Sequence, residues 1–214
     1  MRTQCKKSLG NVPKLSRSLE LFGILLVMAF LASGCALTKD YVALSYDPQT
    51  NVEKMKRAEG VSVKIEISDV RTIRDKVSSK KNGYGIEMAA IIAQNDVGDL
   101  LKKAIEAEFR NRGFELADGS VQVFVELNKY YNDFKTGFWS GKAVAEVIMN
   151  VQVKKADKSI LYSKLITGEN TLTVQLSSGK NAKLALDAAL KDAMSKLFAD
   201  AGFTDSCFKA CLIE

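Results

Sequence analysis

Residues 61–68 read Val-Ser-Val-Lys-Ile-Glu-Ile-Ser, and apolar side chains alternate with polar ones through all eight positions. Successive side chains of a β-strand point to opposite faces, so this alternation predicts a strand with one buried face and one wet face. The same pattern predicts strands over residues 121–127 and 143–154. Residues 160–175 predict another strand, with a bulge at Gly168.

Two shorter apolar segments are further candidates for strands. Residues 114–116 precede an Asp118-Gly119 turn and the strand that starts at Val121, which predicts a hairpin. The apolar run of residues 86–93 is compatible with either an extended segment or the approach to a helix.

Two apolar stripes at helical spacing predict two helices. Asn95 or Asp96 can cap the start of the first helix, and Gly113 suits its left-handed stop, while Gly202 closes the second. The resulting order is β-α-β-β-β-β-α. We therefore expect an α+β fold, an antiparallel or mixed sheet of about five strands with two helices packed on one face. The stripes are Val97, Leu100, Leu101, Ala104, Ile105 and Phe109, then Leu186, Leu190, Ala193, Met194, Leu197 and Phe198.

The segments around this domain predict its limits. Polar residues interrupt any period over residues 35–60, which predicts a tether, so the folded domain is expected to span residues 61–203. Within it, residues 69–84 are rich in Lys and Arg and hold an Asn-Gly turn, which predicts a mobile loop, either simply solvated or touching anionic lipid or a partner. Residues 204–214 form a C-terminal tail.

The N-terminus has the organisation of an export signal. Its apolar run, residues 21–32, is shorter than the roughly 20 residues that a membrane-spanning helix requires. Five Lys and Arg and a single Glu20 precede this run. The following Ala32-Ser33-Gly34-Cys35 resembles the bacterial lipobox, although Leu is commoner where Ala32 stands. Residues 1–34 are thus predicted to be a lipoprotein signal peptide.

Cys35 is accordingly predicted to carry the lipid, palmitate included, that anchors the mature protein to the membrane. The alternatives are a secretory signal with an A-x-A-like cleavage site or an uncleaved anchor, with Cys35 buried or in a disulfide. By resemblance to Gram-negative lipoproteins, a residue other than Asp at position 36 implies the periplasmic face of the cell outer membrane.

Signal removal also changes the charge. Residues 1–34 hold five of the 31 Lys and Arg and one of the 25 Asp and Glu, so the mature chain carries a net charge of only +2. It lacks the basic block that phosphate backbones attract, which disfavours nucleic-acid binding.

The tail contains two cysteines, Cys207 and Cys211. In an oxidising periplasm a local disulfide is favoured, although a bridge at helical spacing requires the end of the helix to distort. A metal site is less favoured because zinc normally takes four ligands and the chain has no histidine. Free or intermolecular thiols are the third alternative.

Aromatic residues crowd the connection between the strands that start near residues 121 and 143. They are Tyr130, Tyr131, Phe134, Phe138 and Trp139. One interpretation is that Tyr130 and Phe134 close the end of the sheet and belong to the core. The other is a hairpin tip that inserts at a bilayer interface or contacts a protein partner, since Tyr and Trp combine apolar area with a hydrogen-bonding edge.

The sequence shows no catalytic constellation. Without histidine, Ser-His-Asp and Cys-His nucleophile systems and the usual metal sites are excluded. No cofactor is predicted, and we expect a protein that is not an enzyme.

Several segments together resemble the YajG-type bacterial lipoproteins, a family of uncharacterised cell-envelope proteins. Besides the lipobox at Cys35, they are VSVKIEISDVR from Val61, DLLKKAIEAEFRNRGF from Asp99, VQVFVELN from Val121 and the terminal LALDAALKDAMSKLFAD. The resemblance implies an envelope lipoprotein with an α+β domain and no established enzymatic activity. It transfers no site residues.

Two functional hypotheses follow. The first is a non-enzymatic envelope accessory or protein-interaction module, tethered to the membrane through Cys35 so that an envelope protein partner is recruited there. The second is a binder, or a weak hydrolase, of a small ligand or cell-wall fragment, with its site on the sheet or beside the basic loop.

Overall fold

The computed structural model describes residues 37–119, 121–137 and 139–211 of the protein. Its contacts divide the chain into two units, Met1–Thr38 and Lys39–Glu214, and every element named below belongs to the second unit. Within the described ranges, no helix has both the length and the apolar character needed to cross a membrane.

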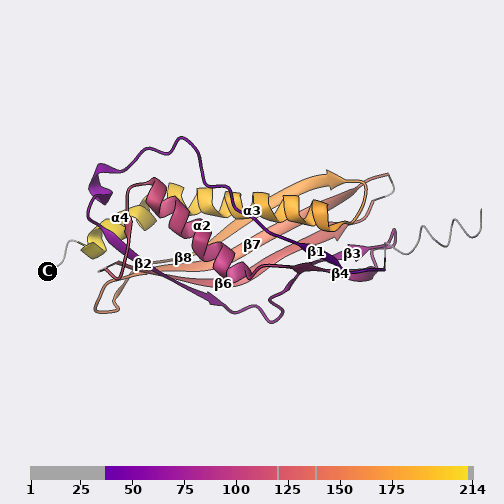
Figure 1. The fold of residues 1–214 in the computed structure, drawn as a ribbon, viewed down its shortest axis with the longest axis horizontal. Helices are drawn as coiled ribbons and strands as arrows, with labels where there is room; N and C mark the ends of the chain where they lie inside the picture. Colours follow the sequence, from indigo (N-terminus) through magenta and orange to yellow (C-terminus); the bar gives the residue numbers. More distant parts are fainter. Residues whose placement is uncertain (1–36, 120, 138, 212–214) are drawn as a thin grey trace, which may run out of the picture. The chain divides into compact units, whose positions relative to one another are not determined.

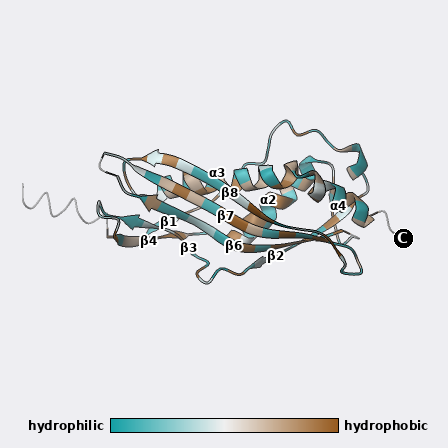
Figure 2. Ribbon diagram, turned by 180° about the vertical axis from the view of Figure 1, so that it is seen from behind, coloured by the Kyte–Doolittle hydropathy of each residue, from teal (hydrophilic) through white to brown (hydrophobic). Residues whose placement is uncertain are grey.

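Three long strands form one side of a single sheet, with the last of them at its edge. β6 (Val121–Lys135) pairs antiparallel with β7 (Gly141–Lys154), and β7 pairs antiparallel with β8 (Ile160–Val174). Buried and partly buried side chains alternate along β6 and β7. Figure 2 shows the corresponding hydrophobic and hydrophilic bands along these strands. The period of two in the sequence therefore separates the two faces of the sheet.

The sheet divides on the other side of β6. β2 (Ser62–Asp69) runs parallel to the first half of β6, whereas β3 (Lys76–Lys81) meets the second half at the bridge between Ser78 and Asn132. The register of β6 against β7 shifts between Leu127 and Lys129, where one set of partners gives way to the other.

Three short strands complete the sheet. β4 (Glu87–Ala93) pairs antiparallel with β3, and β1 (Asp40–Val42) pairs parallel with β4. β5 (Glu115–Leu116) pairs parallel with the start of β2. Over the described residues the sheet thus has eight strands, in a mixture of parallel and antiparallel pairs.

One face of this sheet is covered by helices α2 (Val97–Asn111) and α3 (Gly179–Ala199), followed by α4 (Ala201–Cys211) (Figure 1). A short 3-10 turn, η2 (Lys56–Ala58), precedes β2. The Asp96 carboxylate accepts a hydrogen bond from the Asp99 N–H at 2.8 Å and caps α2. Gly113, just after α2, adopts a φ of 92°, the left-handed conformation that glycine allows at a helix end.

At the end of the domain where α4 lies, aromatic rings from three helices and a loop pack against one another. We call this end the base. Phe109 is its centre: its ring lies 5.1 Å from those of Phe114 and Phe198 and 5.8 Å from that of Phe203. Phe208 of α4 stacks on Phe114 at 5.5 Å. All five side chains are buried.

The predicted α+β class is confirmed, but the expected number of elements was too low. The sheet has more strands than five, because β1 is too short and β3 too polar to produce an alternation, and the apolar run that forms β4 was compatible with either a strand or the approach to a helix. The described part of the chain also holds three α-helices rather than two, since Asp200 ends α3 and α4 begins directly after it.

Two local predictions for the strands were wrong. β5 and β6 do not form a hairpin: both run parallel to β2, which lies between them. Gly168 is not a bulge, because it pairs regularly with Val147. A Cβ at Gly168 would lie 2.2 Å from the backbone oxygen of Ala189, so the glycine lets α3 approach the sheet closely.

The described part of the predicted tether packs against the domain. Beyond β1, Leu44 is buried and the Tyr46 hydroxyl donates to the buried Glu108 carboxylate of α2. Likewise, the predicted loop of residues 69–84 contains β3, in which Ser78 and Ser79 are buried. The hydroxyl of Ser78 donates to the backbone oxygen of Asn132 at 2.7 Å, a long-range contact that stabilises a polar strand inside the sheet.

Candidate functional site

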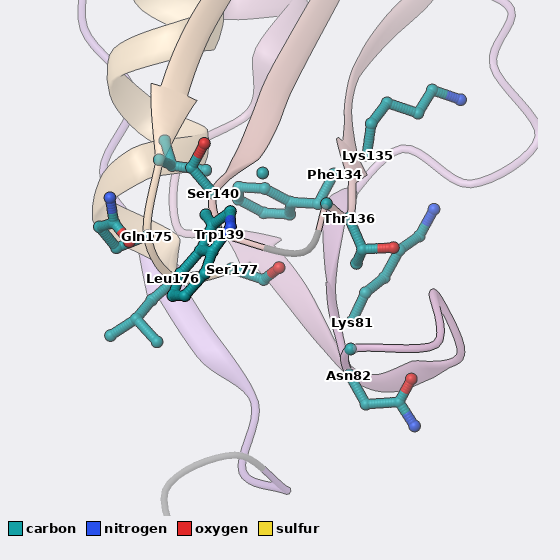
Figure 3. A pocket seen from close by; sticks show the side chains of 14 residues that line it. Lys81, Asn82, Phe134, Lys135, Thr136, Trp139, Ser140, Gln175, Leu176 and Ser177 are labelled. Atoms are coloured by element: carbon teal, nitrogen blue, oxygen red, sulfur yellow. The ribbon is translucent and has the colours of Figure 1, made fainter.

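The end of the domain opposite the base gathers three connections around a surface depression of about 240 Å³ (Figures 1 and 3). We call this end the tip. It comprises the turn between β3 and β4 (residues 82–86), the described part of the β6–β7 connection (residues 136–137 and 139–140) and the β8–α3 connection (residues 175–178). Figure 3 shows side chains from all three connections, among them Asn82, Trp139 and Leu176, around the depression.

The side chain of Asn82 stabilises the turn between β3 and β4. The amide oxygen of Asn82 accepts hydrogen bonds from the N–H groups of Tyr84 and Ile86, both at 3.0 Å. Gly85 takes a φ of 81°, which permits the sharp reversal. Because the backbone of the turn is satisfied internally, the side chains of Tyr84 and Ile86 remain free to project outward.

Large apolar side chains are exposed on each of the three connections. Tyr84 is 92% exposed, Trp139 86%, Leu176 74% and Ile86 61%. Phe134, which also lines the depression, is by contrast 2% exposed. Phe134 thus forms a packed floor, Trp139 and Leu176 line the depression in solvent, and Tyr84 and Ile86 are exposed on the adjoining turn. We call these four exposed side chains the rim, and large apolar side chains gathered at one end of a domain are typical of a contact surface.

Asp133 of β6 holds two lysines beside the depression. Its carboxylate pairs with Lys81 of β3 and, at 2.5 Å, with Lys135. Partial burial raises the pKa of Asp133, but the hydrogen bonds from the two ammonium groups outweigh burial and hold that pKa below its ordinary value. The carboxylate is thus ionised at neutral pH and connects β3 to β6.

Asp40 of β1 fixes the start of the domain to the same end. Its carboxylate pairs with Lys80 of β3 at 2.6 Å and accepts the N–H of Gly179, the first residue of α3, at 2.8 Å. Burial raises the pKa of Asp40, and the hydrogen bonds from Lys80 and Gly179 more than offset this, so the pKa lies below its ordinary value. Lys80 and Gly179 adjoin Lys81 of the depression and the β8–α3 connection, so β1 lies at the tip.

The structure separates the five aromatic residues predicted as a contact site. Tyr130 and Phe134 are buried and close the end of the sheet, in agreement with the core interpretation for these two. Tyr131 is half-buried on the opposite face of the sheet, with its hydroxyl 3.2 Å from that of Ser79. Trp139 is exposed at the tip, and Phe138 lies outside the described residues.

A second depression, of about 290 Å³, lies on the face of the sheet turned away from the helices. Lys129 and Glu146 form an ion pair across β6 and β7 there, and Tyr131 and Val144 lie beside them. We call the outward-facing side chains of β6, β7 and β8 the open face. Towards the base it also carries Phe124, whose ring lies 4.6 Å from the Lys154 ammonium.

The predicted disulfide is not formed: Cys207 and Cys211 are both free thiols within α4. Residues four apart on a regular helix have Cβ atoms about 5–6 Å apart, whereas a disulfide requires about 3.5–4.5 Å. Burial raises the pKa of the Cys207 thiol to about 12, so this sulfur is a poor nucleophile. Cys35 lies outside the described residues.

Sequence reasoning missed Tyr84, Ile86 and Leu176, which complete the tip. Tyr84 and Leu176 are single apolar side chains in polar segments, and Ile86 begins the apolar run of residues 86–93, so only the fold brings the three together. In the described ranges, we find no group of three or more acidic, Cys or His side chains suited to a metal ion.

Comparison with known proteins gives a family. The family model described as "Uncharacterized lipoprotein" matches residues 48–205, about three quarters of the chain. Among curated proteins, none matches the sequence significantly.

Solved structures supply similar folds. A Xanthomonas campestris protein of family DUF330 is 16% identical, with a TM-score of 0.50, and the match covers 78% of this chain and 96% of that one. A minor lipoprotein from Acinetobacter baumannii is 7% identical, with a TM-score of 0.38 and coverage of 65% and 93%. The first of these likenesses shows a shared fold.

Proposed function

The chain belongs to the family of uncharacterised, YajG-type lipoproteins, and from this membership we propose that it is a non-enzymatic interaction module. In this proposal Cys35 carries the lipid, the anchored protein lies on the periplasmic face of the outer membrane, and the domain binds a protein of the cell envelope. Ala36, by resemblance to Gram-negative lipoproteins, supports the outer membrane over the inner one.

The position of β1 is the observation that carries this proposal. Asp40 is the fifth residue after Cys35, and five residue steps of extended chain reach at most about 18 Å. Since Asp40 is bound to Lys80 and Gly179 at the tip, a lipid on Cys35 tethers the tip end of the domain to the membrane. The base and most of the open face then extend into the periplasm.

The chemistry of the open face supports a protein partner. Its half-buried aromatic and aliphatic side chains, Phe124, Tyr131, Val144 and Ile148, alternate with ion-paired and polar groups. Aromatic residues, tyrosine among them, are enriched at protein interfaces, whereas a sheet face that only meets water is commonly polar throughout. In addition, without histidine the chain cannot assemble the common nucleophile systems, which supports binding over catalysis.

The anchor is tested by metabolic labelling. Cells that express the full chain should incorporate radiolabelled palmitate into it, and the Cys35→Ser variant should lose the label. The wild-type protein should co-fractionate with outer-membrane markers. Persistent labelling of the variant, or an unlabelled wild type, would refute the lipid assignment.

The partner surface is tested by site-specific photo-crosslinking in cells. A crosslinker at Ile148, in the middle of the open face, should capture one envelope protein. Introducing Tyr131→Glu into the same chain should reduce that capture at least tenfold. Leu184 of α3, which is 51% exposed on the helical side, is the control position. Equal capture from Leu184 and Ile148, or capture indifferent to Tyr131→Glu, would contradict an interface on the open face.

A further inference from the structure

Beyond the lipid anchor, we infer that the tip itself is a bilayer-binding site, with Tyr84, Ile86, Trp139 and Leu176 seated in the interface of the phospholipid membrane. This inference rests on the proposed function, because it requires the lipid on Cys35. Acylation holds Asp40 within about 18 Å of the membrane surface, and Asp40 binds Lys80 and Gly179, which adjoin the depression at the tip. Trp139 and Leu176 line the depression, and Tyr84 and Ile86 are exposed on the turn whose Asn82 and Gly83 also line it, so the bilayer can reach all four.

The kind of side chain favours a membrane over water. Among the described residues, the exposed aromatic side chains are Tyr41, Tyr84 and Trp139, and all three belong to β1 or to the tip. Tyr and Trp concentrate where membranes meet water, because their rings take the apolar side and their polar edges the wet side. The exposed aliphatic residues elsewhere, such as Ile73 and Ile160, have no aromatic companions of this kind.

The charge of the tip has the sign that anionic lipids attract. Asp40 and residues 80–86, 133–142 and 174–180 together contain five lysines and two carboxylates. Lys142 and Lys180 are exposed and make no ion pair within the described residues. Lysines that surround an apolar rim are typical of surfaces that bind phospholipid head groups. The lysines are Lys80, Lys81, Lys135, Lys142 and Lys180, and the carboxylates are Asp40 and Asp133.

Trp139 is the only tryptophan in the sequence, so its fluorescence reports the tip directly. The mature acylated protein is reconstituted into vesicles of three parts phosphatidylethanolamine to one part phosphatidylglycerol. We expect Trp139 emission to shift to shorter wavelength than in the detergent-free Cys35→Ser protein in buffer. Phospholipids brominated near the head group should quench at least half of that emission, whereas aqueous acrylamide should quench it less than in buffer.

An exposed isoleucine far from the tip provides the control for variants of the rim. Ile86→Ser with Leu176→Ser removes two rim side chains and should abolish most of the bromolipid quenching. Ile160→Ser removes an isoleucine that is 55% exposed, at the far end of β8 from the tip, and should leave the quenching unchanged.

The outcomes separate this inference from the proposed function. A palmitate-labelled protein whose Trp139 stays accessible to acrylamide and unquenched by bromolipid overturns the membrane site alone. A wild-type protein that incorporates no palmitate overturns both the membrane site and the proposed lipid anchor. Protection of Trp139 that arises only after an envelope extract is added would assign the tip to a protein and equally overturn the membrane site.

Discussion

At the base of the domain, five phenylalanine rings lie within 6 Å of their neighbours and away from solvent, whereas at the tip Tyr84 and Trp139 are almost fully exposed. Ion pairs show the same contrast. Glu108 and Arg112 are buried at the base, while Lys135 beside Asp133 at the tip is largely in water. Aromatic and charged side chains thus stabilise the fold at the base, whereas at the tip side chains of the same kinds are exposed to solvent.

The largest expected effect is on the aromatic cluster of the base. Phe109→Ala removes the ring that contacts three others, and we expect it to lower the free energy of unfolding by about 3–5 kcal/mol, because a cavity remains in a packed core. Urea unfolding of the mature chain, followed by circular dichroism, measures the change. A loss below about 1 kcal/mol would mean that the base does not carry the stability that its packing indicates.

The buried ion pair should give the next largest effect. Glu108 accepts hydrogen bonds from Tyr46, from the Gln49 N–H at 2.8 Å and from Arg112. Glu108→Gln leaves the Arg112 guanidinium buried without a counter-charge, and we expect a loss of about 3 kcal/mol. Asp133→Asn at the tip should lose less than about 1 kcal/mol, because that pair is partly in solvent.

A second variant at the base checks the cause of this loss. Adding Arg112→Met to Glu108→Gln should recover part of the lost stability, since the unpaired charge is then removed. No recovery would show that the hydrogen bonds to residues 46–49, and not the charge, account for the loss.

Sequence reasoning succeeded where the structure is local. The alternation at Val61–Ile67 and the stripe from Val97 to Phe109 each bury one face of a single element, so a short window of sequence contains the signal. It failed where burial is arranged by distant partners. Ser78 and Ser79 of β3 are polar, yet Asn132 and Tyr131, more than 50 residues away, satisfy their hydroxyls inside the sheet.

The tip, too, could be predicted from the sequence only in part. The aromatic residues from Tyr130 to Trp139 were found because they are close in sequence, but their burial follows the alternation of β6 and not their crowding. Phe134 faces α3 and is buried, while Trp139 lies beyond the end of the strand. Leu176 and Tyr84 join Trp139 only through the pairing of β3 with β6 and of β7 with β8, which no short window of sequence contains.

The attachment of β1 to the tip should depend on pH. The pKa of Asp40 is lower in the folded chain than its usual unfolded value of about 3.9, so ionised Asp40 stabilises the fold. This contribution is complete at neutral pH and is lost as the pH falls through the lowered pKa. We expect Asp40→Asn to lower the free energy of unfolding by about 1 kcal/mol at pH 6.

At acidic pH that difference should vanish, because wild-type Asp40 is then also neutral. Urea unfolding of both proteins at a series of pH values measures it, and hydrogen exchange of the Gly179 amide reports the same bond locally. A difference that persists unchanged below pH 3 would mean that shape rather than charge holds β1 in place.

The smallest expected effect on stability is that of Trp139→Ala. An exposed ring on a connection contributes little to the core, so the free energy of unfolding should change by no more than about 0.5 kcal/mol, measured by urea unfolding against Phe109→Ala. A small change would show that the ring of Trp139 contributes little to the free energy of folding, as expected of a side chain that serves a contact surface. If Trp139→Ala instead lowers the free energy of unfolding by more than about 1.5 kcal/mol, Trp139 is part of the packing of the tip. The proposed contrast between a stabilising base and an exposed tip would then be wrong.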